Sequence, residues 1–291
     1  GDKLVYCFTN NPKNGLLTLN VCFAVGIMHD SGESAFARGL IKRMFEHPPF
    51  QTKTQISHVF VAIDPNAGGD SRFGICSAFY RQGKMIIAGL DAVKSKSPSA
   101  YEPVLLDHIN KLRSQYITAN SLIVVMVENN LGFESYHIER FIKRTPARSY
   151  TCFMTDKDQK VGLRTTNPIK ESMWIKFKTF LEEDAVFFWE HLVSASDSYT
   201  LKEMKKQLKD ELINYKVMVE LPKTVFQQTK RTYTGKIGGA MDDMSVTIQL
   251  NALCKLKLLR AVLFPSHIYL LFTQGILSST HQNMRIIIKI I

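Results

Sequence analysis

The sequence lacks the cysteine and histidine spacings that bind zinc or build a disulfide framework. Its cysteines are Cys7, Cys22, Cys76, Cys152 and Cys254, which are odd in number and scattered, without a CxxC pair. No two histidines stand at a metal-ligand spacing, so we expect the histidines to be structural or surface residues. These absences exclude a small disulfide-stabilised domain and favour a reducing compartment.

Nucleotide-binding and acyl-transfer motifs are also absent. The chain has no GxxxxGK[ST] loop, no GxGxxG fingerprint and no GxSxG nucleophile elbow. The missing phosphate-binding loop excludes an ATP site of the P-loop type within these residues.

Long uninterrupted apolar runs are scarce, and low-complexity segments and internal repeats do not occur. The most apolar late stretch, 258–277, is broken by Arg260, Pro265 and His267, so we do not expect it to span a membrane. The first residues lack a signal-peptide pattern, and Gly1 in place of Met is expected of an excised fragment or a tag remnant.

Acidic residues are fewer than basic ones. The 291 residues include 37 Lys and Arg against 26 Asp and Glu, a net charge of +11, with 45% hydrophobic residues. This composition is typical of a globular protein that is long enough to bury a substantial core. The positive excess favours a polyanionic partner, nucleic acid before membrane, with an ordinary basic soluble protein as the alternative.

One short stretch shows how the chain is organised. Five consecutive apolar residues, 59–63, lead directly to Asp64, and Pro65 and a glycine-rich turn over 66–69 follow. A short apolar run that turn residues terminate predicts a fully buried strand. Asp64 would then lie at the rim of a sheet, either as a turn residue or as a metal ligand.

The pattern from this strand onward predicts the order β-β-β-α-β-α-β. Strands are expected at 58–64, 73–80, 85–90, 122–127 and 149–154, and helices at 101–116 and 134–143. Three strands in hairpin order, followed by strands that alternate with helices, predict an α/β fold. Its central sheet is expected to be mixed, antiparallel first and parallel later, with helices on its faces.

The remaining segments are expected to surround this sheet. Helices are predicted at 34–45, 169–181 and 200–212, strands within 16–28 and at 185–193, and two strands within 216–233. Local rules conflict after Asp242 and Asp243, because the apolar residues alternate as in a strand over 244–250. We predict a helix to about 259, since two carboxylates favour a helix N-terminus.

Acidic residues mark three places in this order. Asp64 ends the first core strand, Glu128 follows the strand at 122–127, and Asp242 and Asp243 begin the late helix. If the two strands are parallel neighbours, Asp64 and Glu128 lie at one sheet edge, where α/β folds bind ligands. Clustered carboxylates repel one another without cations, and hard oxygen ligands suit Mg²⁺ or Mn²⁺. Two such ions can activate a water and stabilise the leaving oxygen of a phosphodiester. The alternative for each acid is a cap or a turn residue.

Three motifs contain these acids: Val-Ala-Ile-Asp-Pro-Asn-Ala-Gly-Gly at 61–69, Val-Val-Met-Val-Glu-Asn-Asn at 124–130, and Gly-Lys-Ile-Gly-Gly-Ala-Met-Asp-Asp-Met at 235–244. In this order and spacing they resemble the C-terminal nuclease domain of a herpesviral terminase large subunit, as does the segment 162–170. The resemblance covers about residues 58–258. It implies an RNase H/integrase-like fold and a carboxylate triad made of Asp64, Glu128 and one of Asp242 or Asp243.

The resemblance further implies an endonuclease that uses two Mg²⁺ or Mn²⁺ ions to cut concatemeric viral double-stranded DNA during genome packaging, with little sequence specificity. Its partners would be DNA, other terminase subunits and the capsid portal, in the host cell nucleus. The absent ATP motifs fit a fragment without the ATPase domain. We expect 1–57 to be a lead-in segment packed on the core, 58–258 the nuclease domain, and 259–291 a C-terminal tail inside or outside that domain.

A basic, glycine-punctuated stretch at 229–239 precedes the paired aspartates. Lys230, Arg231 and Lys236 are candidates for contacts with DNA phosphates, and a solvated hairpin tip is the alternative. Two other functions stay open. One is a recombinase or Holliday-junction resolvase of the same fold, and the other is a non-catalytic module that grips DNA or docks subunits.

Overall fold

The computed structural model of the protein describes residues 5–10, 17–22, 33–52, 55–65, 71–95, 97–116, 121–130, 134–156, 158, 160–196, 199–220, 230–236 and 241–263. The chain divides into two compact units, Gly1–Glu33 and Ser34–Ile291. The first contains an antiparallel pair of strands, β1 (Val5–Asn10) and β2 (Leu17–Cys22). The second contains the central sheet and all the described helices.

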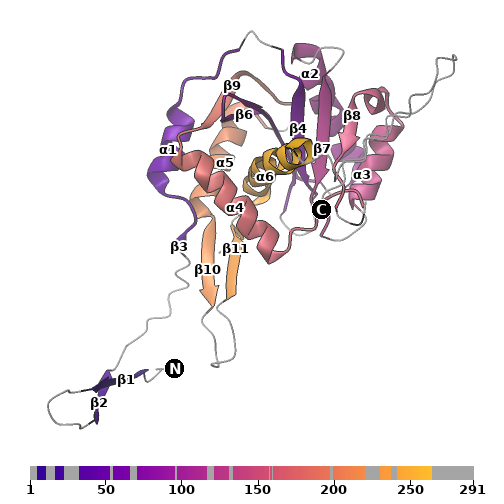
Figure 1. Ribbon diagram of the computed structural model, residues 1–291. Helices are drawn as coiled ribbons and strands as arrows, with labels where there is room; N and C mark the ends of the chain where they lie inside the picture. The colour runs from indigo at the N-terminus through magenta and orange to yellow at the C-terminus, as the bar shows by residue number, and fades with distance from the viewer. Residues whose placement is uncertain are drawn as a thin grey trace. The chain divides into compact units, whose positions relative to one another are not determined.

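The central sheet has six strands in the order β8-β7-β4-β5-β6-β9 (Figure 1). These strands are β4 (His58–Asp64), β5 (Phe73–Arg81), β6 (Lys84–Val93), β7 (Leu122–Val127), β8 (Thr151–Phe153) and β9 (Val186–Val193). The pairs β4–β5 and β5–β6 are antiparallel, whereas β4–β7, β7–β8 and β6–β9 are parallel. The mixed sheet predicted from the sequence, antiparallel first and parallel later, is confirmed.

The apolar run before Asp64 is explained by burial on both faces of β4. Val59, Val61 and Ile63 belong to one core cluster, and Phe60 and Ala62 belong to a second one. Successive side chains of a strand point to opposite faces, so a strand covered on both sides needs an unbroken run of apolar residues.

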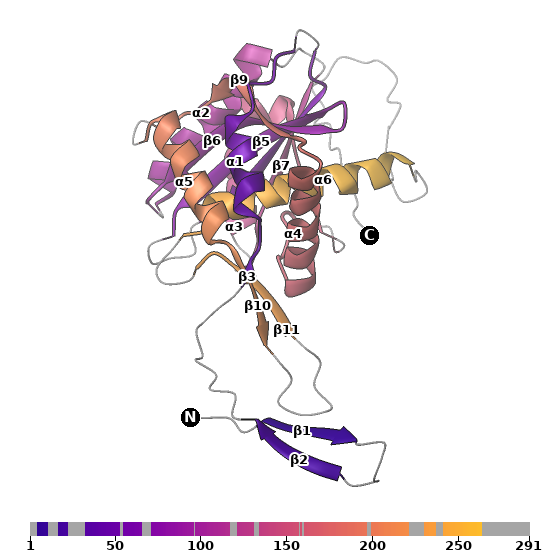
Figure 2. The same cartoon turned by 90° about the vertical axis from the view of Figure 1, so that its left-hand side faces the viewer.

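Helices cover both faces of the sheet (Figure 2). The cluster that contains Val61 includes side chains of α2 (Pro98–Tyr116) and α3 (Glu134–Lys143). The two core clusters on the other face of the sheet include side chains of α1 (Arg38–Glu46), α4 (Asn167–Glu182), α5 (Leu201–Asn214) and α6 (Asp243–Leu263). The result is a three-layer α/β/α arrangement. None of the described helices is long and apolar enough to cross a membrane.

The late segment with conflicting local rules is a helix, as expected. Helix α6 contacts β4 and β5 on one side and α4 and α5 on others, and every residue from Asp242 to Cys254 is buried. Its polar residues between the alternating apolar ones are buried too. For example, Asn251 donates to the carbonyl oxygens of Cys76 and Thr247, at 2.8 and 3.3 Å. Burial on all sides therefore removed the one-faced apolar stripe that would have identified the helix.

A smaller sheet in the order β11-β10-β3 contains β10 (Lys216–Glu220), β11 (Lys230–Thr234) and β3 (Glu33–Ser34). The two strands predicted within 216–233 are confirmed as β10 and β11, and β11 contains the first part of the basic stretch, as far as Thr234. Residues 221–229 and 237–240, the glycine turn at 66–69 and the tail beyond 263 lie outside the described residues. The domain boundaries proposed at 57/58 and 258/259 stay predictions.

Candidate metal centre

Asp64 and Glu128 stand side by side at the carboxyl edge of the sheet. Strands β4 and β7 are parallel neighbours with Ile63 opposite Val127, and the Glu128 N–H donates to the Ile63 carbonyl at 2.8 Å. Both carboxylates are mostly buried, with residue exposures of 7% and 9%. The sequence-based expectation that these two strands bring the acids to one edge is met.

The start of α6 brings Asp242 and Asp243 to the same edge. Gly74 of β5 lies opposite Asp64 in the sheet register, and a Cβ atom on Gly74 would be 3.0 Å from the Asp243 carbonyl oxygen. A glycine at this position therefore allows the helix end to approach the strand closely. Asp242 and Asp243 are both buried.

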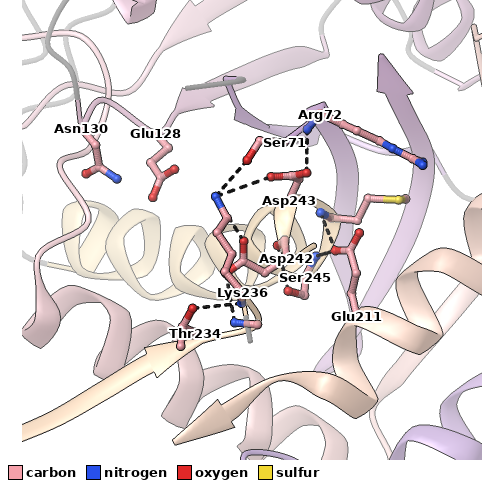
Figure 3. A network of polar contacts seen from close by, with 12 residues as sticks. Ser71, Arg72, Glu128, Asn130, Glu211, Thr234, Lys236, Asp242, Asp243 and Ser245 are labelled. Carbon is pink, nitrogen blue, oxygen red and sulfur yellow. Dashed lines mark hydrogen bonds and ion pairs between the residues drawn. The ribbon is translucent and has the colours of Figure 1, made fainter. Parts of the chain in front are cut away.

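All four acids line one cavity of about 150 Å³. The other residues that line it are Pro65, Ser71, Asn130, Glu134, Lys170, Thr234, Lys236 and Val246. The close view in Figure 3 shows Glu128 and Asn130 on one side and the aspartate pair on the other, with Lys236 between them. The three acidic places picked out of the sequence thus meet in space.

The acids perturb one another. Burial raises the pKa of Asp64 well above its usual value, and the charge of Glu128, a hydrogen bond with Glu128, and the charges of Asp243 and Asp242 raise it further. Burial also raises the pKa of Asp243, against the opposing influence of a hydrogen bond from Arg72 and the charge of Lys236. Such a cluster is stabilised by positive charge placed within it.

Lys236 supplies positive charge from the chain itself. Its Nζ atom lies 3.5 Å from Asp242 Oδ1 and 4.0 Å from Asp243 Oδ1, and it donates a hydrogen bond to Ser71 Oγ at 3.1 Å (Figure 3). Burial lowers the pKa of Lys236, but the charges of Asp242, Asp243 and Asp64 outweigh it and raise the pKa overall. The Lys236 side chain is 51% exposed, so it reaches the acids from the solvent side.

The chemistry of these donors fits a hard divalent cation. The four predicted acids and Glu134 offer carboxylate oxygen ligands, and the buried Oδ1 of Asp242 accepts no hydrogen bond. Among the described residues, however, no three acidic, histidine or cysteine side chains converge at metal-ligand spacing. The oxygen donors therefore suit Mg²⁺ or Mn²⁺. In this structure the described carboxylates stand too far apart for three of them to share one ion, and the charge of Lys236 lies among them.

Glu128 is held by Thr165, and Thr165 is in turn held by Asn130; neither was predicted to be a site residue. The Thr165 hydroxyl donates to Glu128 Oε1, and Asn130 exchanges hydrogen bonds with Thr165 at 3.0 Å in both directions. The loop that carries Thr165 approaches β7 through Gly162, whose φ is +93° and whose added Cβ would lie 2.9 Å from the Val127 carbonyl oxygen. Asn130 had a sequence signal, since it follows the strand that ends before Glu128. No sequence signal indicated that Thr165 would hold Glu128.

The predicted phosphate-binding residues are placed differently from one another. Lys236 lines the cavity, whereas Arg231 lies in β11 and pairs with Glu171 at 3.5 Å. Lys230 begins β11 opposite Glu220, and its side chain is outside the described part of the chain. A second cavity lysine, Lys170 at the start of α4, was not predicted.

A serine, a histidine and an aspartate also meet elsewhere in the fold. His108 contacts Asp91 through Nδ1 at 2.5 Å and Ser77 through Nε2 at 3.0 Å, which is the connectivity of a hydrolytic triad. All three residues are fully buried between β5, β6 and α2. A nucleophile sealed in the core meets no substrate, so this network is structural.

Comparison with known proteins identifies the fold. No protein-family description and no curated protein matches the sequence. Among solved structures, the human cytomegalovirus terminase nuclease domain soaked with Mn and bound to an inhibitor matches with a TM-score of 0.57 and 15% identity, over 78% of this chain and 97% of that one. The Mn-soaked domain without inhibitor matches with a TM-score of 0.54 and 14% identity, over 75% and 94%. The same domain without either matches with a TM-score of 0.55 and 12% identity, over 78% and 97%. The resemblance seen in the sequence is thus confirmed at the level of fold, because the chain shares the RNase H-like fold of the human cytomegalovirus terminase nuclease domain.

Proposed function

We propose that the protein is a divalent-metal-dependent endonuclease that hydrolyses phosphodiester bonds of double-stranded DNA. The observation that carries this proposal is the meeting of four buried carboxylates in one cavity at the carboxyl edge of the sheet. The fold shared with a terminase nuclease domain supports it.

In this proposal Asp64, Glu128 and one or both of Asp242 and Asp243 hold two Mg²⁺ or Mn²⁺ ions. When bound, such ions supply the charge that activates water and stabilises the departing oxygen of a phosphodiester. Thr165 keeps Glu128 in place through its hydroxyl, and Asn130 fixes Thr165.

The chain's own cations contribute to substrate binding. Lys170 and Lys236 line the cavity that contains the carboxylates, where they can pair with the phosphates that flank the cut. Contacts of this kind position DNA without reading its bases, which accords with cleavage of little sequence specificity.

The wider setting follows from the likeness to the cytomegalovirus terminase domain. We propose that the substrate is concatemeric viral DNA, cut during genome packaging in the host cell nucleus. The other terminase subunits and the capsid portal would be partners, and a separate part of the motor would supply ATP hydrolysis.

A plasmid-cleavage assay with Mn²⁺ tests the central proposal. Asp64→Asn and Glu128→Gln are expected to abolish cleavage while each variant stays folded and binds DNA. Asp107→Asn is the matched control, because Asp107 is a half-exposed acid that pairs with Lys111 at 2.8 Å in α2, outside the cavity. Undiminished cutting by Asp64→Asn would contradict the proposed function.

Cleavage of branched against linear DNA and calorimetric titration with Mn²⁺ separate the two alternatives. A resolvase-type nuclease would cut branched DNA in preference to linear duplex. A non-catalytic gripping or docking module would bind DNA without cutting it, and calorimetry would detect no Mn²⁺ binding that depends on Asp64.

A further inference from the structure

The first turn of α6 has its backbone donors satisfied from another helix. The N–H groups of Met244 and Ser245 both donate to Oε2 of Glu211, at 2.8 and 2.9 Å. Glu211 lies on α5 and is buried. Orphan N–H groups at a helix start are more often capped by the residue that immediately precedes the helix.

That preceding residue is Asp242, an amino acid that caps helices well. Its carboxylate is used elsewhere. Oδ2 accepts the Gly235 N–H at 3.0 Å, and Oδ1 faces Lys236 across 3.5 Å (Figure 3). The Asp243 carboxylate is likewise held away from its own helix, because Oδ2 accepts the Arg72 N–H at 2.7 Å.

Glu211 is fixed in its capping position by its own helix. Gln207 Nε2 donates to Glu211 Oε1 at 2.7 Å, and the Arg72 guanidinium donates to Gln207 Oε1. Since the Arg72 N–H binds Asp243, the contacts form a closed ring through Glu211, Gln207, Arg72 and the start of α6. Glu211 itself does not line the cavity, so it acts on the site only through α6.

We propose that Glu211 is a positioning residue that caps α6 in place of Asp242 and so leaves the Asp242 and Asp243 carboxylates directed at the cavity. Without this acceptor, the Asp242 side chain, which stands at the N-cap position of α6, is the group that ordinarily accepts the N–H groups of Met244 and Ser245. The Asp242 carboxylate would then cap the helix and would no longer be available to a cation in the cavity. This inference rests on the proposed metal-dependent function.

Calorimetric titration of the full chain with Mn²⁺, without DNA, provides the test. Glu211→Leu removes the acceptor and is expected to weaken Mn²⁺ binding by about 10-fold or more, as loss of groups that orient metal ligands does. Glu211→Gln keeps an acceptor oxygen and is expected to bind within about threefold of the wild type. Leu208→Ala is the matched control. Leu208 is buried on the same helix, so this substitution lowers stability without removing a hydrogen-bond acceptor.

Three outcomes would overturn the proposal: wild-type affinity in Glu211→Leu, an equal loss in Leu208→Ala, or an equal loss in Glu211→Gln. Should Glu211→Leu not fold, Gln207→Leu removes the group that fixes Glu211, and unchanged Mn²⁺ affinity in that variant would overturn the proposal instead.

A crystal structure of metal-free Glu211→Leu (or of Gln207→Leu) separates this inference from the proposed function. Wild-type protein that takes up no Mn²⁺ would contradict the proposed function. The capping role would still be decided by whether the Asp242 carboxylate has moved onto the Met244 and Ser245 N–H groups, and an unmoved carboxylate would contradict it.

Discussion

The ammonium group of Lys236 lies 3.5 Å from Oδ1 of Asp242, within a cavity that four further carboxylates line. The proposed metal centre therefore contains a cation that belongs to the chain. The contribution of Lys236 to stability and its contribution to DNA binding can be measured separately.

Lys236→Met is expected to lower the free energy of unfolding of the metal-free protein by about 1 kcal/mol or less, because the Lys236 side chain is half-exposed and its ion pairs are screened. Added Mn²⁺ is expected to reduce this deficit, since the metal would replace the missing positive charge. Urea denaturation with EDTA and with Mn²⁺ measures both. Lys202→Met, an exposed lysine of α5, is the control. Equal deficits with and without Mn²⁺ would count against the shared site.

The same variant addresses DNA binding. If Lys236 contacts a phosphate, Lys236→Met weakens binding of every duplex and lowers the salt dependence of the affinity by about one ion. Fluorescence anisotropy over a range of salt concentrations gives the slope. A slope equal to that of the wild type would remove Lys236 from the interface.

Thr165→Val is expected to weaken Mn²⁺ binding by about 10-fold, because valine has nearly the same shape but cannot donate to Glu128. The fold should persist, since Asn130 keeps its contact with the Thr165 N–H at 3.0 Å. Calorimetry measures the affinity, and Thr179→Val, whose hydroxyl binds only within α4, is the control. Wild-type affinity in Thr165→Val would show that Glu128 needs no clamp.

The stability of the protein is expected to depend on pH through Glu211. Burial raises its pKa to about 7, above the usual 4.5, against opposing hydrogen bonds from Gln207, Ser245 and Met244. The folded state therefore binds this proton more tightly than the unfolded state does. Its stabilising effect is complete below pH 4.5 and is lost as pH rises through 7, on the order of 3 kcal/mol in total.

Glu211→Gln removes this titration and keeps an acceptor oxygen. Urea denaturation of both proteins in EDTA, from pH 4.5 to 8.5, should show wild-type stability falling relative to the variant over this range. Parallel profiles would mean that Glu211 titrates normally in the folded state.

The buried Asp91 is expected to matter for stability alone. It accepts hydrogen bonds from His108, from the Ser194 hydroxyl and from the N–H groups of Ala195 and Ser196. Asp91→Ala leaves these donors unpaired in the core and should cost about 3–5 kcal/mol. Chemical denaturation measures the loss. Ser77→Ala should leave DNA cleavage unchanged, and a loss of cleavage in that folded variant would contradict a purely structural network.

The sequence predicted the parts of the site that strand ends determine. Asp64 and Glu128 each follow an unbroken apolar run, and such a run leaves few alternatives to a buried strand. The sheet order then brings their ends together. The start of α6 was predictable only from its paired aspartates, because burial on all sides hid its helical periodicity.

The residues that position these acids were not predictable, because their contacts are formed only by the fold. Thr165 reaches Glu128 across 37 residues, and Glu211 reaches Met244 across 33. Neither residue belongs to a local motif. Lys236 was predicted to meet DNA, and its contacts with the neighbouring aspartates became visible only with the geometry.

Helix α6 joins the sheet from far along the chain. Asn251 binds the Cys76 carbonyl across 175 residues, and Arg72 binds Asp243 across 171. Contacts of such sequence separation slow folding, because the loop-closure entropy must be overcome before they stabilise the chain. During synthesis from the N-terminus, the edge of the nascent sheet lacks Asp242 and Asp243 until α6 emerges from the ribosome and docks. The four acids of the proposed metal centre meet only after α6 has docked, so a partly made chain has an incomplete site for the proposed cations.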